Sequence, residues 1–79
     1  MITGSQIRAA RALLGWSQQD LADKSLLSET AILKLETQSA DSRTSTLIKV
    51  RKSLEDAGIE FITRPDGAAG VLVKPRNKA

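Results

Sequence analysis

The sequence contains no cysteine and no histidine among its 79 residues. Without them the chain has no disulfide, no thiolate and no imidazole to bind a transition metal. The same absence removes the imidazole and the thiol that many enzymes use, and no glycine-rich phosphate loop follows a predicted strand, so only a lysine- or carboxylate-based site would remain possible. Its nine acidic residues show no pairing beyond ordinary helix spacing. We therefore expect no enzymatic activity, no cofactor and no metal.

Long apolar segments are also absent. No stretch approaches the roughly 20 apolar residues that a membrane-spanning helix requires. The opening residues MITGSQIRAAR lack the apolar core of a secretion signal, so we expect a cytoplasmic protein. A chain of 8.5 kDa forms a sufficient apolar core alone only with difficulty, and oligomerisation would supply additional buried surface.

Basic residues exceed acidic residues only slightly, but they are unevenly distributed. Twelve Lys and Arg against nine Asp and Glu give a net charge of +3. Arg8 and Arg11 lie in an acid-free opening, and residues 43–52 form a second acid-free stretch. Its basic members are Arg43, Lys49, Arg51 and Lys52. Such clusters are typical of proteins that contact the phosphates of nucleic acid. For Lys49, Arg51 and Lys52 we favour the alternative that they lie on a solvated helix face and bind no ligand.

Two short amphipathic segments follow one another within residues 16–36, WSQQDLADKSLLSETAILKLE. The first is predicted to begin just after Ser17, whose hydroxyl can accept from a first-turn amide, while Asp20 places negative charge at the positive end of the helix dipole. Residues 25–28 end this helix, and the Ser28 hydroxyl caps the next one. So short a link forces a sharp crossing, which predicts a helix-turn-helix.

The second of these helices has an apolar side and an outward side. Ile32 and Leu35 are three residues apart with Ala31 beside them, a spacing that buries one side. The outward positions are Glu29, Thr30, Leu33, Lys34 and Thr37. Because the second helix of such a motif lies in the major groove of duplex DNA, these residues are candidate DNA contacts. Leu33 is unusual on an outward side, where it would contact a thymine methyl or help to close the core.

Residues spread over the first two thirds of the chain match the motif of a known family. They are Ser17, Gln18, Asp20, Leu21, Ala22, Leu27, Ser28, Ile32, Leu35, Glu36, Thr46 and Leu47. On these residues the chain resembles the Cro/repressor-like helix-turn-helix family, also called the xenobiotic-response-element family, over roughly residues 5–57. The resemblance implies a bacterial or phage regulator that acts as a two-fold dimer on near-palindromic DNA.

The resemblance also implies roles for individual residues. Glu29, Thr30 and Lys34 match base-contacting positions. Lys34 suits guanine O6 and N7, Glu29 suits cytosine N4, and the Thr30 methyl suits thymine. Glu29 has an alternative role, because a carboxylate in the first turn is favoured by the helix dipole alone.

Other residues of the motif are assigned to the DNA backbone or to the protein itself. Four match phosphate-contacting positions of the family: Gln18, Thr37, Gln38 and Arg43. Glu36 is expected instead to tie its helix to the rest of the domain through Arg8 or Arg11.

Three positions depart from the family pattern. Leu26 stands where the inter-helix turn usually has glycine, and a left-handed backbone there costs roughly 1 to 2 kcal/mol for a residue with a side chain. We expect either that strain or a remodelled turn. The family's usual glycine after Glu36 is replaced by Thr37, Gln38 and Ser39, and the proline common before its fourth helix is replaced by Ser42. The loop over residues 37–42, which should approach the DNA backbone, therefore differs from the family.

Two further helices are expected on either side of the motif. The T-x-x-Q sequence beginning at Thr3 is typical of a capping box and opens a helix over about residues 4–14, which Gly15 ends in a left-handed conformation. A fourth helix from about Thr44 carries an apolar face that closes the core, and Gly58 ends it.

The last third of the chain is strand-like. Residues 59–63 and 71–74 flank a turn signal at residues 65–67, which predicts a β-hairpin. The hairpin offers more apolar surface than one face of a two-stranded ribbon can bury. The residues that contribute it are Ile59, Phe61, Ile62, Val71, Leu72 and Val73. A lone hairpin is marginal in water. It packs either on the helical core, which is credible for Phe61, or against a second subunit, which we prefer.

Together these patterns predict a mainly α protein. Residues 1–57 form a four-helix, repressor-like helix-turn-helix domain, residues 58–75 a β-hairpin for dimerisation, and residues 76–79 a flexible basic tail. The predicted function is sequence-specific binding of double-stranded DNA, as a dimeric repressor on a near-palindromic operator. Two alternatives remain open: an antitoxin similar to the HipB type, which binds a toxin and autoregulates its operon, and an antiactivator that binds protein.

Overall fold

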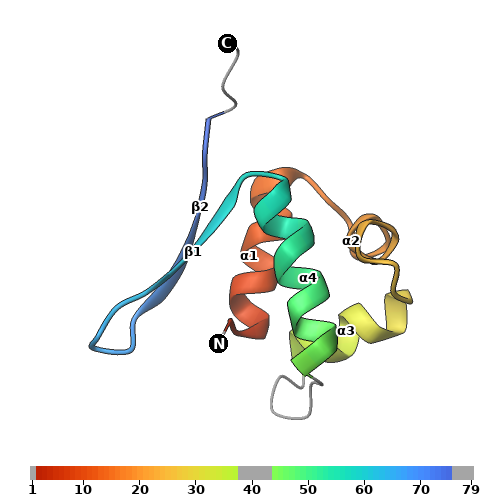
Figure 1. The fold of residues 1–79 in the computed structure, drawn as a ribbon, viewed down its shortest axis with the longest axis horizontal. Coiled ribbons are helices and arrows are strands. Elements are labelled where there is room, and N and C mark those ends of the chain that lie inside the picture. The colour runs from red at the N-terminus through yellow and green to blue at the C-terminus, as the bar shows by residue number, and fades with distance from the viewer. Residues whose placement is uncertain (1, 38–43, 76–79) are drawn as a thin grey trace.

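The computed structural model describes residues 2–37 and 44–75, which form four helices followed by a two-stranded antiparallel sheet (Figure 1). The helices are α1 (Gly4–Leu14), α2 (Gln18–Ser25), α3 (Glu29–Thr37) and α4 (Thr44–Asp56), and the strands are β1 (Ile59–Thr63) and β2 (Ala69–Val73). Only residues 26–28 separate α2 from α3. The predicted mainly α fold with a C-terminal hairpin is therefore confirmed.

The first three helices begin where the sequence predicts capping. At α1 the Gln6 amide donates to Thr3 Oγ1 over 3.2 Å, and the Thr3 amide donates to Gln6 Oε1 over 2.9 Å. Ser17 and Asp20 make the same reciprocal pair of bonds at α2. The Ser28 hydroxyl accepts a first-turn amide of α3 over 3.1 Å. These caps satisfy amides that the first turn of a helix leaves unpaired, and they fix the starts of α1, α2 and α3.

Leu26 ends α2 in a left-handed conformation that usually requires glycine. Its φ is 57° and its ψ 42°, and among the described residues no other non-glycine residue has a positive φ. The side chain is 88% exposed, so no buried contact compensates for the strain. Of the two outcomes expected for this turn, the strained backbone is the one observed.

Replacing Leu26 with glycine is expected to stabilise the domain by about 1 kcal/mol, because strain is relieved while no buried contact is lost. Thermal unfolding followed by circular dichroism should show a Tm higher by about 4 to 8 °C. Leu26→Ala is the matched control, since it removes the side chain but keeps the strain, and its Tm should stay near that of the wild type. A glycine variant that melts below the wild type would contradict strain at this residue.

One apolar core joins all four helices to the hairpin. Its largest fully buried side chains are Ile7, Leu21, Ile32, Val50, Leu54 and Ile59. Five partly buried side chains pack against this core: Leu14, Trp16, Leu27, Phe61 and Val71. Because α1, α2, α3, α4 and β1 all contribute, the orientation of α3 depends on the whole domain rather than on the short turn alone.

The two strands pair over five residues, from Ile59 opposite Val73 to Thr63 opposite Ala69. Thus β2 begins two residues earlier than the predicted strand over residues 71–74 and ends one residue earlier. The pairing extends toward the turn because the Arg64 amide donates to the Ala68 carbonyl over 2.8 Å. The first two residues of β2 are alanine and glycine, which lack the branched side chains typical of strands.

The hairpin packs on the helices of its own subunit. In Figure 1 it lies beside α1, on the opposite side of α1 and α4 from α2 and α3. Gln6 is buried, and its Nε2 donates to the carbonyls of Ile62 over 3.2 Å and Gly70 over 3.0 Å. One amide of α1 therefore holds both strands.

The apolar side chains of the hairpin divide between core and surface. Ile59 is buried, and Phe61 and Val71 pack against the core, so packing within the subunit accounts for these three. Leu72 and Val73 remain 50% and 42% exposed. Ile59 was included in the predicted dimerisation set, but it lies inside its own subunit. The surface available for a second subunit comes from the exposed residues.

Candidate nucleic-acid interface

α3 has a buried side and an exposed side, as the sequence predicts. Ile32, Leu35 and Glu36 are buried, and Ala31 is half-buried. The exposed residues are Glu29, Thr30, Leu33, Lys34 and Thr37. Leu33 is 47% exposed, so of the two roles considered for it, closing the core does not apply.

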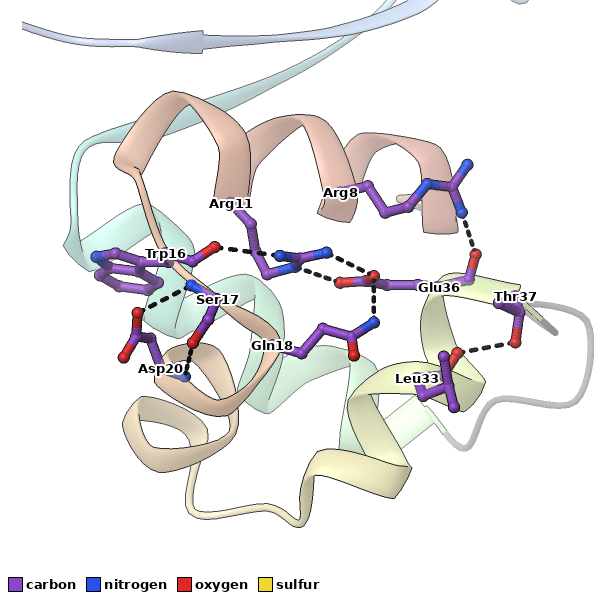
Figure 2. Close-up of polar contacts among 9 residues, drawn as sticks. All are labelled: Arg8, Arg11, Trp16, Ser17, Gln18, Asp20, Leu33, Glu36 and Thr37. Atoms are coloured by element: carbon purple, nitrogen blue, oxygen red, sulfur yellow. Dashed lines mark hydrogen bonds and ion pairs between the residues drawn. The ribbon is translucent and has the colours of Figure 1, made fainter.

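Glu36 anchors the last turn of α3 to α1 and α2 (Figure 2). Its carboxylate accepts from Arg11 Nε over 2.6 Å, from Arg11 Nη2 over 2.9 Å and from Gln18 Nε2 over 3.1 Å. Its backbone carbonyl accepts from Arg8 Nη1 over 2.6 Å. Of the two partners considered for Glu36, Arg11 bonds its carboxylate and Arg8 bonds its main-chain carbonyl, and these bonds hold the end of α3 against α1.

The pair of Arg11 and Glu36 is largely excluded from solvent. Their side chains are 17% and 1% exposed, and Arg11 Nη1 also donates to the Trp16 carbonyl over 3.1 Å. The hydrogen bonds to Glu36 raise the pKa of Arg11, and the attraction between the two charges adds to this against the opposing effect of burial. Since folding raises this pKa, the part of the stability that comes from charging Arg11 is complete below the ordinary pKa of arginine and is lost as the pH rises through the raised value. Arg11 thus stays charged throughout the practical pH range.

At Gly4, α1 lies directly against the backbone of α3. A Cβ atom built there would lie 2.5 Å from the carbonyl oxygen of Glu36 and 2.8 Å from that of Leu35. This contact was not predicted, because a glycine near the start of a helix does not by itself indicate what packs against it.

The charged residues on the exposed side of α3 form no ion pairs with the part of the chain that the structure describes. Within residues 2–37 and 44–75, neither Glu29 nor Lys34 has an ion-pair partner. On α4, by contrast, Arg51 pairs with Glu55 over 3.0 Å and Lys52 with Asp56 over 3.4 Å. These pairs support the interpretation of this part of α4 as a solvated face.

The sequence model of the helix-turn-helix family matches residues 7–55, from within α1 to the last turn of α4. The chain belongs to this family. Helix-turn-helix domains of this kind bind DNA in transcription regulators. No curated protein matches the chain. The matched region ends before the hairpin, so β1 and β2 lie outside the part that the family defines.

Two of the predicted phosphate contacts of this helix-turn-helix domain are engaged within the protein. Gln18 opens α2, and its side-chain amide donates to Glu36, which leaves its second N–H for a phosphate. Thr37 donates its single hydroxyl proton to the Leu33 carbonyl over 2.8 Å, so this geometry does not offer that proton to a phosphate.

Several predicted features of the chain fall outside the described residues. They are Gln38 and Arg43, most of the loop over residues 37–42, and the basic tail over residues 76–79. In the part that is described, no helix is long and apolar enough to cross a membrane. No three His, Cys, Asp or Glu side chains of this part are grouped to hold a metal ion.

Proposed function

We propose that this protein is a sequence-specific regulator of transcription whose α3 enters the major groove of double-stranded DNA. The observation that carries the proposal is the exposed side of α3, which is held by a buried ion pair at one end and capped by Ser28 at the other. A helix fixed at both ends presents its outward side chains in one geometry. Such a geometry suits recognition of base edges.

The outward residues divide into roles by their chemistry. Lys34 donates to guanine O6 and N7, and Glu29 accepts from cytosine N4. Thr30 brings a methyl group to the same face. Backbone amides and the remaining N–H of Gln18 at the start of α2 face phosphate, because the positive end of a helix favours anions.

The regulator acts as a dimeric repressor on a near-palindromic operator, with the two α3 helices in successive major grooves about 34 Å apart. Exposed Leu72 and Val73 on β2, together with unpaired strand edges, support a second hairpin as the dimer partner. Analytical ultracentrifugation at micromolar concentration should show twice the 8.5 kDa mass of the chain. A clean monomer would remove the dimer from the proposal.

Fluorescence anisotropy tests the function directly. The full chain is titrated into labelled DNA from upstream of its own gene and into scrambled DNA, each at two salt concentrations. Tighter binding to the upstream DNA that survives the higher salt is expected for a sequence-specific regulator. Equal and salt-sensitive binding, or none, would contradict it and favour a protein partner such as a toxin.

Replacing Lys34 with alanine is expected to lower operator affinity by about 1 to 3 kcal/mol and to relax the preference at one base pair. Lys74→Ala is the control, because it removes the same charge from an exposed side chain at the end of the hairpin. Binding-site selection with both variants measures the preference. The same consensus for Lys34→Ala and for the control would show that Lys34 does not contact a base.

A further inference from the structure

The exposed side of α3 is apolar along its middle and charged along its margins. At about 100° per residue, Thr30, Leu33 and Thr37 fall within an arc of about 60°. Glu29 and Lys34 lie about 40° beyond the two ends of this arc. We call Thr30, Leu33 and Thr37 the methyl row, because each can present a methyl group at the centre of the exposed side.

Leu33 and Thr37 of the methyl row present carbon rather than polar atoms. Leu33 is 47% exposed and is not part of the core. Figure 2 shows the Thr37 hydroxyl turned toward the backbone of Leu33, to whose carbonyl it donates over 2.8 Å. With its hydroxyl bonded inside the helix, Thr37 is left with its methyl group for a ligand. An exposed leucine between two threonines therefore forms the centre of the proposed DNA contact.

The edges of bases in the major groove offer hydrogen-bonding groups and one apolar group, the C5 methyl of thymine. An apolar strip that entered the groove opposite polar edges would bury them without partners, at a cost in affinity. Opposite a C5 methyl, the same strip removes apolar surface from water on both sides. The charges at the margins of α3 do not compete for this site, since the methyl row itself carries none.

We infer that the methyl row recognises the C5 methyl group of a pyrimidine in the operator. The inference rests on the proposed function and deepens it, by naming the group that the centre of α3 contacts. Thymine is one source of this group, and 5-methylcytosine carries it at the same place in the groove. Leu33 is the principal contact and the two threonines lie on either side of it along the helix.

The experiment uses the best site obtained by binding-site selection with the full chain. Each thymine of one half-site is replaced singly by deoxyuridine, which removes only the methyl group, and affinity is measured by fluorescence anisotropy. For the wild type, one or more replacements should weaken binding about four-fold, the factor expected from one buried methyl-sized group. At the same position 5-methylcytosine should bind more tightly than cytosine.

Variants assign the effect to the methyl row. Leu33→Ala should bind the thymine and deoxyuridine sites equally at the position it contacts. Leu13→Ala is the matched control, because Leu13 is 48% exposed but lies on α1, and it should keep the wild-type discrimination. Thr37→Ser keeps the hydroxyl and removes the methyl. It should therefore lose the preference for thymine over deoxyuridine only at a thymine next to the one that Leu33 contacts.

The possible failures can be told apart. If selection yields no consensus, the proposed function fails and the inference fails with it. If a consensus emerges but deoxyuridine equals thymine at every position, only the inference is overturned. If Leu33→Ala still binds the thymine site more tightly than the deoxyuridine site, the inference is also overturned, because the methyl contact would then belong to another residue.

Discussion

Replacing Gly4 with alanine should destabilise the domain by about 2 kcal/mol through overpacking. The added Cβ would lie 2.5 Å from the Glu36 carbonyl oxygen and 2.8 Å from the Leu35 oxygen. These are backbone atoms at the end of α3, so they cannot move aside as the end of a flexible side chain would. Alanine favours the helix over glycine by about 1 kcal/mol, which offsets only part of the cost. The two helices must therefore separate.

Urea unfolding followed by circular dichroism measures this loss. Gly70→Ala is the matched control, because a Cβ there meets nothing within 4 Å, and its stability should change by no more than about 0.5 kcal/mol. The contact also fixes the C-terminal end of α3, so Gly4→Ala should weaken operator binding under conditions in which it is still folded. A Gly4→Ala variant as stable as the wild type would show that α1 and α3 tolerate a wider spacing.

The helices followed from the sequence because their signals are local. The capping pairs at Thr3 and Ser17 and the left-handed Gly15 involve residues at most a few positions apart, and each satisfies backbone groups of the helix it bounds. The start of β2 was predicted two residues too late. Its first residues, Ala69 and Gly70, form a strand only because β1 and the turn hold them in register.

The tertiary contacts of the candidate site could be predicted only in part. Glu36 was expected to tie α3 to the rest of the domain through Arg8 or Arg11, and the structure adds that this carboxylate is buried and so needs a cationic partner. The bond from Gln18 to Glu36 was not predicted, since its family position indicated a phosphate contact instead. The approach of α1 to α3 at Gly4 was not predicted either, because it depends on the packing of segments about 30 residues apart, which no local pattern encodes.

Replacing Arg11 with methionine should have the largest effect on stability, a loss of about 3 to 5 kcal/mol. The substitution keeps much of the apolar length of the side chain but removes the bonds of 2.6 and 2.9 Å to Glu36. The Glu36 side chain is 1% exposed, so its charge would remain buried, and among the described residues only Gln18 would still donate to it. Small domains are stable by only about 5 to 15 kcal/mol, so urea unfolding should show a large shift of the midpoint.

The double variant Arg11→Met/Glu36→Leu separates the two causes of that loss. If the buried, unpaired carboxylate causes it, removing the carboxylate as well should recover most of the stability, because well-packed apolar residues often replace a buried ion pair at little cost. If the double variant is as unstable as Arg11→Met, the loss arises from the packing of the arginine side chain instead. A recovered double variant would still lack the tie between α3 and Gln18. It should therefore bind the operator more weakly than the wild type at equal stability, which would assign the ion pair a role in positioning α3.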